Sequence, residues 1–211
     1  MPAKLTGQPT RGVDAAVRHA WQAGDASGAI TVVLEAYGGE ILGWLVGVLR
    51  NTDDAGDVFS AFCERLWATF SSFSWRCSIR TWAYTIARRV AIDHQRAEAR
   101  RARRLVPLSV SPEVAQVAER VRTTTLPGLK TANRQAIAQL RDRLPPQDRM
   151  LLVLRVDRGL GWDDLARVFL ERPEPTAAEV KREAARLRKR FQLIKQRLLQ
   201  LGRSAGLVER P

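Results

Sequence analysis

Apolar residues recur at helical spacing along most of this chain, and no stretch alternates like a strand between turn residues. The pattern predicts an all-α protein. It predicts helices over about 29–50, 54–70 and 79–100, with the internal glycines of the first leaving open one helix or a pair. Asn51, Thr52, Asp53 and Asp54 precede the second helix and are typical of a helix N-terminus.

The helix predicted over 54–70 is amphipathic. Its apolar stripe consists of Val58, Phe59, Phe62, Leu66 and Phe70. The opposite face carries Asp57, Ser60, Glu64 and Arg65 and is expected to be free for a partner. The cluster Asp53, Asp54, Asp57 and Glu64 could also suggest a metal site, but acids at a helix start usually complement the helix dipole.

The helix predicted from residue 79 combines arginines with aromatic residues. Its apolar stripe contains Ile79, Trp82, Ala83, Ile86 and Val90. The opposite face is expected to expose Arg80, Tyr84, Arg88, Arg96 and Arg100. Such a basic face with interleaved rings is suited to nucleic acid, although Trp75, Trp82 and Tyr84 could instead belong to the core, which we expect for Trp82.

Prolines and threonines separate this region from a second helical domain. We place a flexible linker at 105–133, with a short helix around 113–122, and predict helices over 135–143, 147–156, 162–170 and 176–201. A helix, a turn and a basic helix in this order indicate a helix-turn-helix domain. The last helix carries a heptad stripe that could form a coiled coil with another chain but is expected to pack within its own domain: Val180, Ala184, Leu187, Phe191, Ile194, Leu198 and Leu201.

The chain has a formal net charge of +13 and a pI near 11.1, which indicates a polyanionic partner. The charge is concentrated in two blocks. Residues 76–104 carry nine Arg and two acids, and residues 181–203 carry nine Lys or Arg and one acid. Two separate basic surfaces are expected to make two contacts with one long nucleic acid, although solvated helix faces would look similar.

Cysteine and histidine are too few for several other classes of protein. Cys63 and Cys77, with His19 and His94, form neither a disulfide framework nor a zinc site of standard spacing. We therefore expect no metal, no cofactor and no enzymatic activity. A reducing cytoplasm fits the two cysteines, and we find neither a signal peptide nor an apolar run of the ~20 residues that span a bilayer.

Two long motifs resemble the extracytoplasmic-function (ECF) type of sigma factor in the sigma-70 family. The run from Asp54 to Trp67 is similar to the form D-A-E-D-x-x-Q-E-x-F-x-R-L-W, and the run from Phe73 to His94 follows F-R-G-x-A-S-L-R-T-W-L-Y-R-I-A-R-N-x-A-I-D-H. A third stretch, from Leu144 to Ala166, is similar to the start of the family's −35 domain. The chain departs at Ser60-Ala61, where the family has Gln-Glu, at Arg89, where it has Asn, and in about four extra residues between Ala166 and Val180.

The resemblance implies a protein that binds core RNA polymerase and recognises and melts promoter DNA. Residues 29–104 would form a region 2-like domain and 134–201 a region 4-like domain, with an extension at 1–28 and a tail at 202–211 left without a role. The implied polymerase-binding residues are Asp53, Asp54, Asp57, Ser60, Ala61, Glu64 and Arg65. The implied −10 residues are Ser74, Trp75, Arg76, Ser78, Arg80, Tyr84, Arg88, Arg89, His94, Arg96, Arg100 and Arg101.

For the −35 element, the implied residues are Thr176, Ala178, Glu179, Arg182, Arg186, Lys189 and Arg190. The resemblance also implies that the chain binds the clamp of the β′ subunit and the flap of the β subunit, and that an anti-sigma protein inhibits it. The chain would act as a monomer within the holoenzyme and would not bind a membrane. The alternative is a free-standing dimeric helix-turn-helix repressor. A nucleic-acid-processing enzyme ranks last because neither histidine has suitable neighbours in the sequence.

Overall fold

The computed structural model describes residues 10–101, 116–117, 119–121, 124, 140–170, 172 and 174–205, without the side chains of Thr10 and 98–101. Within these ranges the chain is helical and contains no strand, which confirms the predicted all-α class. The chain divides into two compact units, residues 1–129 and 130–211. The linker predicted at 105–133 and the short helix around 113–122 lie largely outside the described residues.

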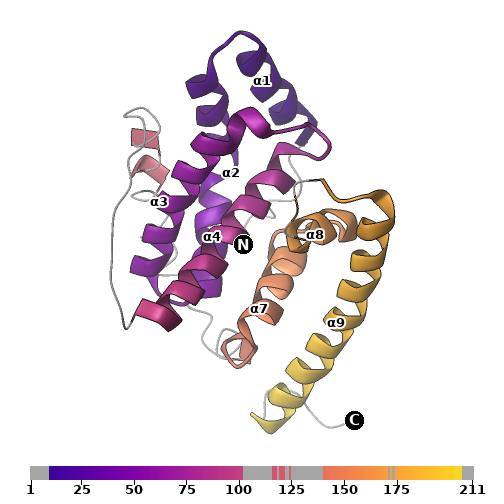
Figure 1. Cartoon of the computed structure of the whole chain (residues 1–211). Helices are drawn as coiled ribbons and strands as arrows, with labels where there is room; N and C mark the ends of the chain where they lie inside the picture. Colours follow the sequence, from indigo (N-terminus) through magenta and orange to yellow (C-terminus); the bar gives the residue numbers. More distant parts are fainter. Residues whose placement is uncertain are drawn as a thin grey trace, which may run out of the picture. The chain divides into compact units, whose positions relative to one another are not determined.

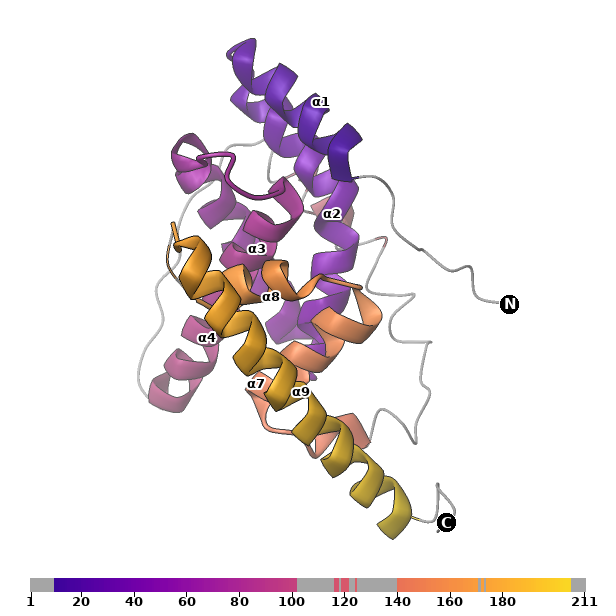
Figure 2. The ribbon, with the colours of Figure 1, turned by 90° about the vertical axis from the view of Figure 1, so that its right-hand side faces the viewer.

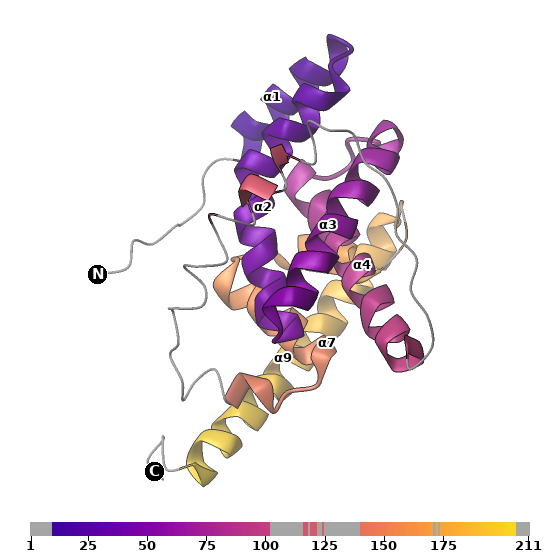
Figure 3. The ribbon, with the colours of Figure 1, turned by 90° about the vertical axis from the view of Figure 1, so that its left-hand side faces the viewer.

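The helices of the described part of unit 1 pack together in a bundle (Figures 1 and 3). They are α1 (Thr10–Gln22), α2 (Ala26–Leu49), α3 (Thr52–Thr69) and α4 (Ile79–Arg101), with a short 3₁₀ turn, η1 (Phe70–Ser72), after α3. Helix α2 packs against α1, α3 and α4, and α4 also packs against α3 and α1. Helices α2 and α4 each touch the other three, so both lie at the centre of the unit.

Helix α2 is continuous, so its internal glycines do not break it. The Asp25 carboxylate accepts a hydrogen bond from the Gly28 amide at 2.7 Å and caps its start. Helix α2 is long and apolar enough to span a membrane by length and composition, which corrects the expectation that no apolar run approaches that length. Ile30, Leu42 and Trp44 are fully buried, as expected for the core helix of a globular unit.

The N-terminal extension predicted at 1–28 is part of this unit. From Thr10 it forms α1, which packs on α2 and buries Val17 completely. The helical unit therefore begins before residue 29. Residues 1–9 lie outside the description.

A short piece of the predicted linker also packs on unit 1. Val117 is buried, and the methyl groups of Val121 lie 3.2 Å from the position that a Cβ atom would take on Gly38 of α2. The fit is tight, so the Val121 side chain would have to move by a few tenths of an ångström to admit a Cβ atom there. This contact attaches the described residues after α4 to the same unit.

Unit 2 contains α7 (Pro146–Leu152), the π-helical segment η2 (Val153–Asp157), α8 (Trp162–Phe169) and α9 (Ala177–Ser204). Figure 2 shows α9 crossing α7 and α8, and it packs against both. Val180, Ala184, Leu187 and Ile194 of the heptad stripe are buried within the unit. The domain's own helices thus cover much of the stripe, as expected, and leave less of it for a coiled coil.

Candidate functional site

One face of α3 combines acidic residues with small polar ones. Val58, Phe59, Phe62, Leu66 and, just after the helix, Phe70 are buried, as predicted. The predicted polymerase-binding residues lie on the other face, where Asp53, Asp57 and Arg65 are exposed and Asp54, Ser60, Ala61 and Glu64 are half-buried. Their spacing places them on adjoining turns of one helix face. This surface is available for a protein partner.

Helix α4 is buried more widely than its apolar stripe predicted. Tyr84 is fully buried, with its ring 5.8 Å from the Trp44 ring in an edge-to-face contact, and Arg88 is only 4 % exposed. The expectation that both side chains lie on an exposed basic face is therefore wrong. The reason is that α4 packs against α1, α2 and α3, so more than one stripe of the helix is covered.

Arg80 lies at the edge of this buried region. Its Nε and Nη2 atoms donate hydrogen bonds to the two carboxylate oxygens of Glu40 at 2.7 and 3.0 Å, and its side chain is 21 % exposed. Burial lowers the pKa of Arg80, but the hydrogen bonds and charge of Glu40 outweigh this effect and raise it. Arg80 thus serves as a bridge between α2 and α4.

The remaining basic residues of α4 lie farther along the helix. Arg89 and Arg96 are exposed and His94 is half-buried. Arg96 Nη1 lies 3.9 Å from Asp93 Oδ1, and both side chains are more than half exposed. This ion pair therefore restrains the Arg96 side chain little. Arg100 and Arg101 are the last two residues of α4, and their side chains lie outside the described residues.

The loop between η1 and α4 carries exposed polar residues around a restrained aromatic ring. Ser74 and Arg76 are exposed, and the half-buried Trp75 has a backbone φ of 59°. A bulky residue in this left-handed region is strained by about 1–2 kcal/mol, so surrounding contacts must hold it. The Trp75 ring lies 4.7 Å from the Phe73 ring, and the Arg18 guanidinium lies 4.6 Å from its centroid.

Ser78 caps the helix that follows this loop. Its hydroxyl oxygen accepts a hydrogen bond from the Thr81 amide at 3.1 Å, and the Ile79 amide donates to Asp14 Oδ1 at 3.0 Å. Ser78, predicted as a DNA contact, therefore has a structural task. Asp14 and Arg18 are not among the predicted site residues, although Asp14, Arg18 and Trp21 have the i, i+4, i+7 spacing of one helix face.

In unit 2 the start of α9 is fixed by a capping box. The Thr176 hydroxyl accepts from the Glu179 amide at 3.3 Å, and the Glu179 carboxylate accepts from the Thr176 amide at 2.8 Å. Hydrogen bonds from Thr176, then the charge and hydrogen bond of Arg172, lower the pKa of Glu179. Thr176 and Glu179, both predicted to read DNA, are thus engaged in starting the helix.

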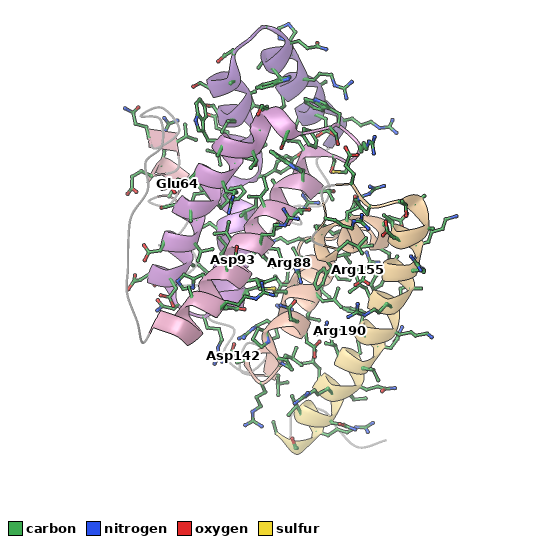
Figure 4. The ribbon with its side chains drawn as sticks, viewed as in Figure 1. Glu64, Arg88, Asp93, Asp142, Arg155 and Arg190 are labelled. Carbon is green, nitrogen blue, oxygen red and sulfur yellow. The ribbon has the colours of Figure 1, made fainter. Side chains whose placement is uncertain are left out.

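The basic residues of α9 fall into two groups. Arg190 Nε donates to Asp148 Oδ1 of α7 at 2.6 Å, and Figure 4 shows Arg190 on the side of α9 that faces α7. Arg186 pairs with Glu183 at 3.3 Å on the helix surface. Exposed residues that remain on the predicted −35 surface are Ala178, Arg182, Arg186 and Lys189. Arg190 is instead a bridge within unit 2.

No group of three or more His, Cys, Asp or Glu residues in the described ranges could hold a metal ion. Asp53, Asp54, Asp57 and Glu64 follow one another along the surface of α3, and the Asn51 side chain caps the start of that helix by accepting from the Asp53 amide at 2.9 Å. Asp53 and Asp54 lie in the first turn, where their charges complement the helix dipole, whereas Asp57 and Glu64 lie farther along the helix.

Comparison with known proteins identifies part of unit 1. Residues 33–101 match the family model for Sigma-70 region 2, which spans most of α2, α3, the loop and α4. No curated protein sequence matches the chain. A solved structure, the sigma factor RpoE in complex with the anti-sigma factor NepR from Bartonella quintana, has a TM-score of 0.49 and 17 % identity and covers 77 % of this chain and 94 % of its own.

The matched segment contains both motifs on which the resemblance of unit 1 rests, from Asp54 to Trp67 and from Phe73 to His94. It also contains the acidic face of α3 and the basic residues of α4. Residues 33–101 are therefore a sigma-70 region 2 domain, as the resemblance of the sequence implied for this part of the chain.

Proposed function

We propose that this chain is a sigma factor of the ECF type, which binds core RNA polymerase and directs promoter-specific initiation of transcription. The observation that carries the proposal is the region 2 match, and the matched segment includes the acidic face of α3 and the exposed arginines of α4. The chain would supply recognition, and the polymerase would supply catalysis. It would then act in the cytoplasm, without a cofactor or enzymatic activity of its own.

The face of α3 is proposed to bind the clamp of the β′ subunit. Asp53, Asp57 and Arg65 are exposed there, and buried aromatic residues hold the other side of the helix. Serine and alanine at 60 and 61 leave room for a partner side chain, whereas the usual Gln-Glu pair would offer longer polar groups. We therefore expect the contact to depend mainly on charge.

The loop 73–78 and the exposed part of α4 are proposed to open and read the −10 element. A base flipped out of the duplex can stack on an aromatic ring and expose edges that pairing hides. Trp75 and its exposed neighbours Ser74 and Arg76 are the candidates for that contact, and Arg89 and Arg96 for phosphates. Tyr84 and Arg88 would support this surface from beneath because they are buried.

Unit 2 is proposed to bind the −35 element with α9. Arg182, Arg186 and Lys189 are exposed near its first half, and recognition helices meet base edges near their N-termini. The capping box of Thr176 and Glu179 would hold the helix start in place. This unit would also contact the flap of the β subunit, and an anti-sigma protein would block the factor until a signal arrives.

Run-off transcription tests this proposal directly. Purified core polymerase is incubated with genomic DNA fragments, with and without this chain, and the transcripts are mapped. We expect specific transcripts only when the chain is present. A dimeric repressor would instead bind duplex DNA specifically without polymerase, so specific binding by the chain alone and no new transcript would support that alternative.

A further inference from the structure

The loop 73–78 is held by a helix outside the segment that matches region 2. Helix α1 contacts the chain before, within and after this loop through residues on one of its faces. The Trp21 ring lies 5.1 Å from the Phe70 ring of η1. Arg18 lies against Trp75 within the loop, and Asp14 contacts Ile79 at its end.

Trp75 depends on such contacts because its backbone is in the left-handed region, with a φ of 59°. An isolated tryptophan rarely adopts this conformation, so the loop would relax without external restraint. A cation against an aromatic ring is attracted by the electrons of the ring face. Arg18, at 4.6 Å from the ring centroid, therefore both restrains Trp75 and adds a positive charge beside it.

Asp14 fixes the point where the loop enters α4. Its carboxylate accepts a hydrogen bond from the first amide of that helix, a donor that has no partner within the helix itself. Ser78 satisfies the Thr81 amide of the same turn. The start of α4 is thus capped from two sides, one of them 65 residues away along the chain.

We propose that α1 sets the conformation in which loop 73–78 reads a promoter base, with Arg18 and Asp14 as positioning residues. This inference rests on the proposed sigma-factor function. Arg18 orients Trp75, and Asp14 holds the end of the loop. Loss of either residue is expected to weaken discrimination between bases more than it weakens binding to polymerase, because the proposed polymerase face is on α3.

The test uses the full chain in holoenzyme and a set of promoters that differ in one base of the −10 element. The measured quantity is the ratio of run-off transcript from the preferred promoter to that from each altered promoter. Arg18→Ala should lower this ratio by about fivefold, the lower end of what stacking of one base contributes. Arg18→Lys, which keeps a cation, should recover part of it. The exposed neighbour His19→Ala is the matched control and should leave the ratio unchanged.

A second pair of variants separates the hydrogen bond from general loss of fold. Asp14→Asn keeps an acceptor for the Ile79 amide, whereas Asp14→Ala removes it. The Ala variant should lower the base ratio, and the Asn variant should retain most of it. The indole N–H resonance of Trp75 in a ¹⁵N-tryptophan spectrum should move in Arg18→Ala, which reports on the contact independently of transcription.

An unchanged base ratio in Arg18→Ala overturns the inference, provided that holoenzyme with the unaltered chain is active. An equal fall in transcription from every promoter counts as such a result, because it leaves the ratio unchanged. A Trp75 resonance that does not move would contradict the contact itself. If the unaltered chain starts no transcript at all, the proposed function fails first, and that result is distinct because it appears before any variant is compared.

Discussion

Arg80 of α4 and Glu40 of α2 form a two-hydrogen-bond ion pair, with donor–acceptor distances of 2.7 and 3.0 Å. The two side chains are 21 % and 23 % exposed, so the pair is partly shielded from water. The sequence pattern had assigned Arg80 to DNA. In the structure, the Arg80 side chain connects α2 to α4, the helix that follows loop 73–78.

Removing one member of this pair should destabilise unit 1. We expect Arg80→Ala to lower the free energy of unfolding by about 1–3 kcal/mol, because Glu40 would lose a charged partner in a half-buried site. Thermal and urea unfolding would measure the change. The double variant Arg80→Met with Glu40→Leu should recover part of the lost free energy of unfolding. An unchanged stability of Arg80→Ala would show that the ion pair contributes little.

Arg96 should contribute to DNA binding through its charge. Its side chain is 61 % exposed, so Arg96→Ala should leave folding unchanged. The slope of the logarithm of open-complex yield against the logarithm of salt concentration should become shallower by about 0.7–0.9, because one phosphate contact is lost. The measurement is open-complex yield against salt concentration. Arg88→Ala is the contrasting variant, since Arg88 is buried and its loss should lower the melting temperature instead. An identical slope for Arg96→Ala would remove it from the phosphate contacts.

Charge reversal on α3 should weaken polymerase binding. Asp57 is exposed and lies beyond the first turn of its helix, so Asp57→Lys should fold normally. We expect markedly less core polymerase to be retained by the immobilised variant, because an attractive charge becomes a repulsive one. Glu35→Lys on the surface of α2 is the matched control. Equal recovery with both variants would contradict the proposed clamp contact.

Arg182 and Arg190 should behave differently although they lie on the same helix. Arg182 is exposed, and Arg182→Ala should change the −35 base preference by about 1–3 kcal/mol at one position while stability stays constant. Arg190→Ala should destabilise unit 2 because Asp148 loses its partner. Transcription from −35 promoter variants and thermal unfolding measure the two effects. A change confined to −10 preference in Arg182→Ala would refute the assignment of α9.

The two cysteines should differ in reactivity with alkylating reagents. Burial raises the pKa of the Cys63 thiol from 9.0 to about 12, whereas Cys77 is half-buried in the −10 loop. At pH 8 the folded Cys77→Ser variant should therefore resist iodoacetamide, and the Cys63→Ala variant should react. Fast alkylation of folded Cys77→Ser would contradict the burial of Cys63.

The same shift gives a pH dependence of stability. The folded state holds the Cys63 proton more tightly than the unfolded state. The contribution of the protonated Cys63 thiol to the free energy of unfolding is therefore complete below pH 9 and is lost as the pH rises from 9 to about 12. Unfolding measured across this window in the Cys63→Ala variant should lack that component.

Local pattern predicted the helices, and two motifs carried the resemblance to sigma-70 region 2 that the match of residues 33–101 supports. The burial of Phe59, Phe62 and Leu66 follows from their spacing, because one stripe of an amphipathic helix must leave water. The heptad of α9 likewise predicted burial of Leu187 and Ile194. These properties depend on residues close together in the sequence, so periodicity is enough to find them.

Which basic residues face a partner was decided only by tertiary structure. Arg88 and Arg96 look alike in a helical pattern, but tertiary packing buries the first and leaves the second exposed. The partners of Arg80, Arg190 and Trp75 are Glu40, Asp148 and Arg18, each from another helix. Periodicity describes one helix at a time, whereas burial and ion pairing depend on which helices meet, and that is set by packing of the whole domain.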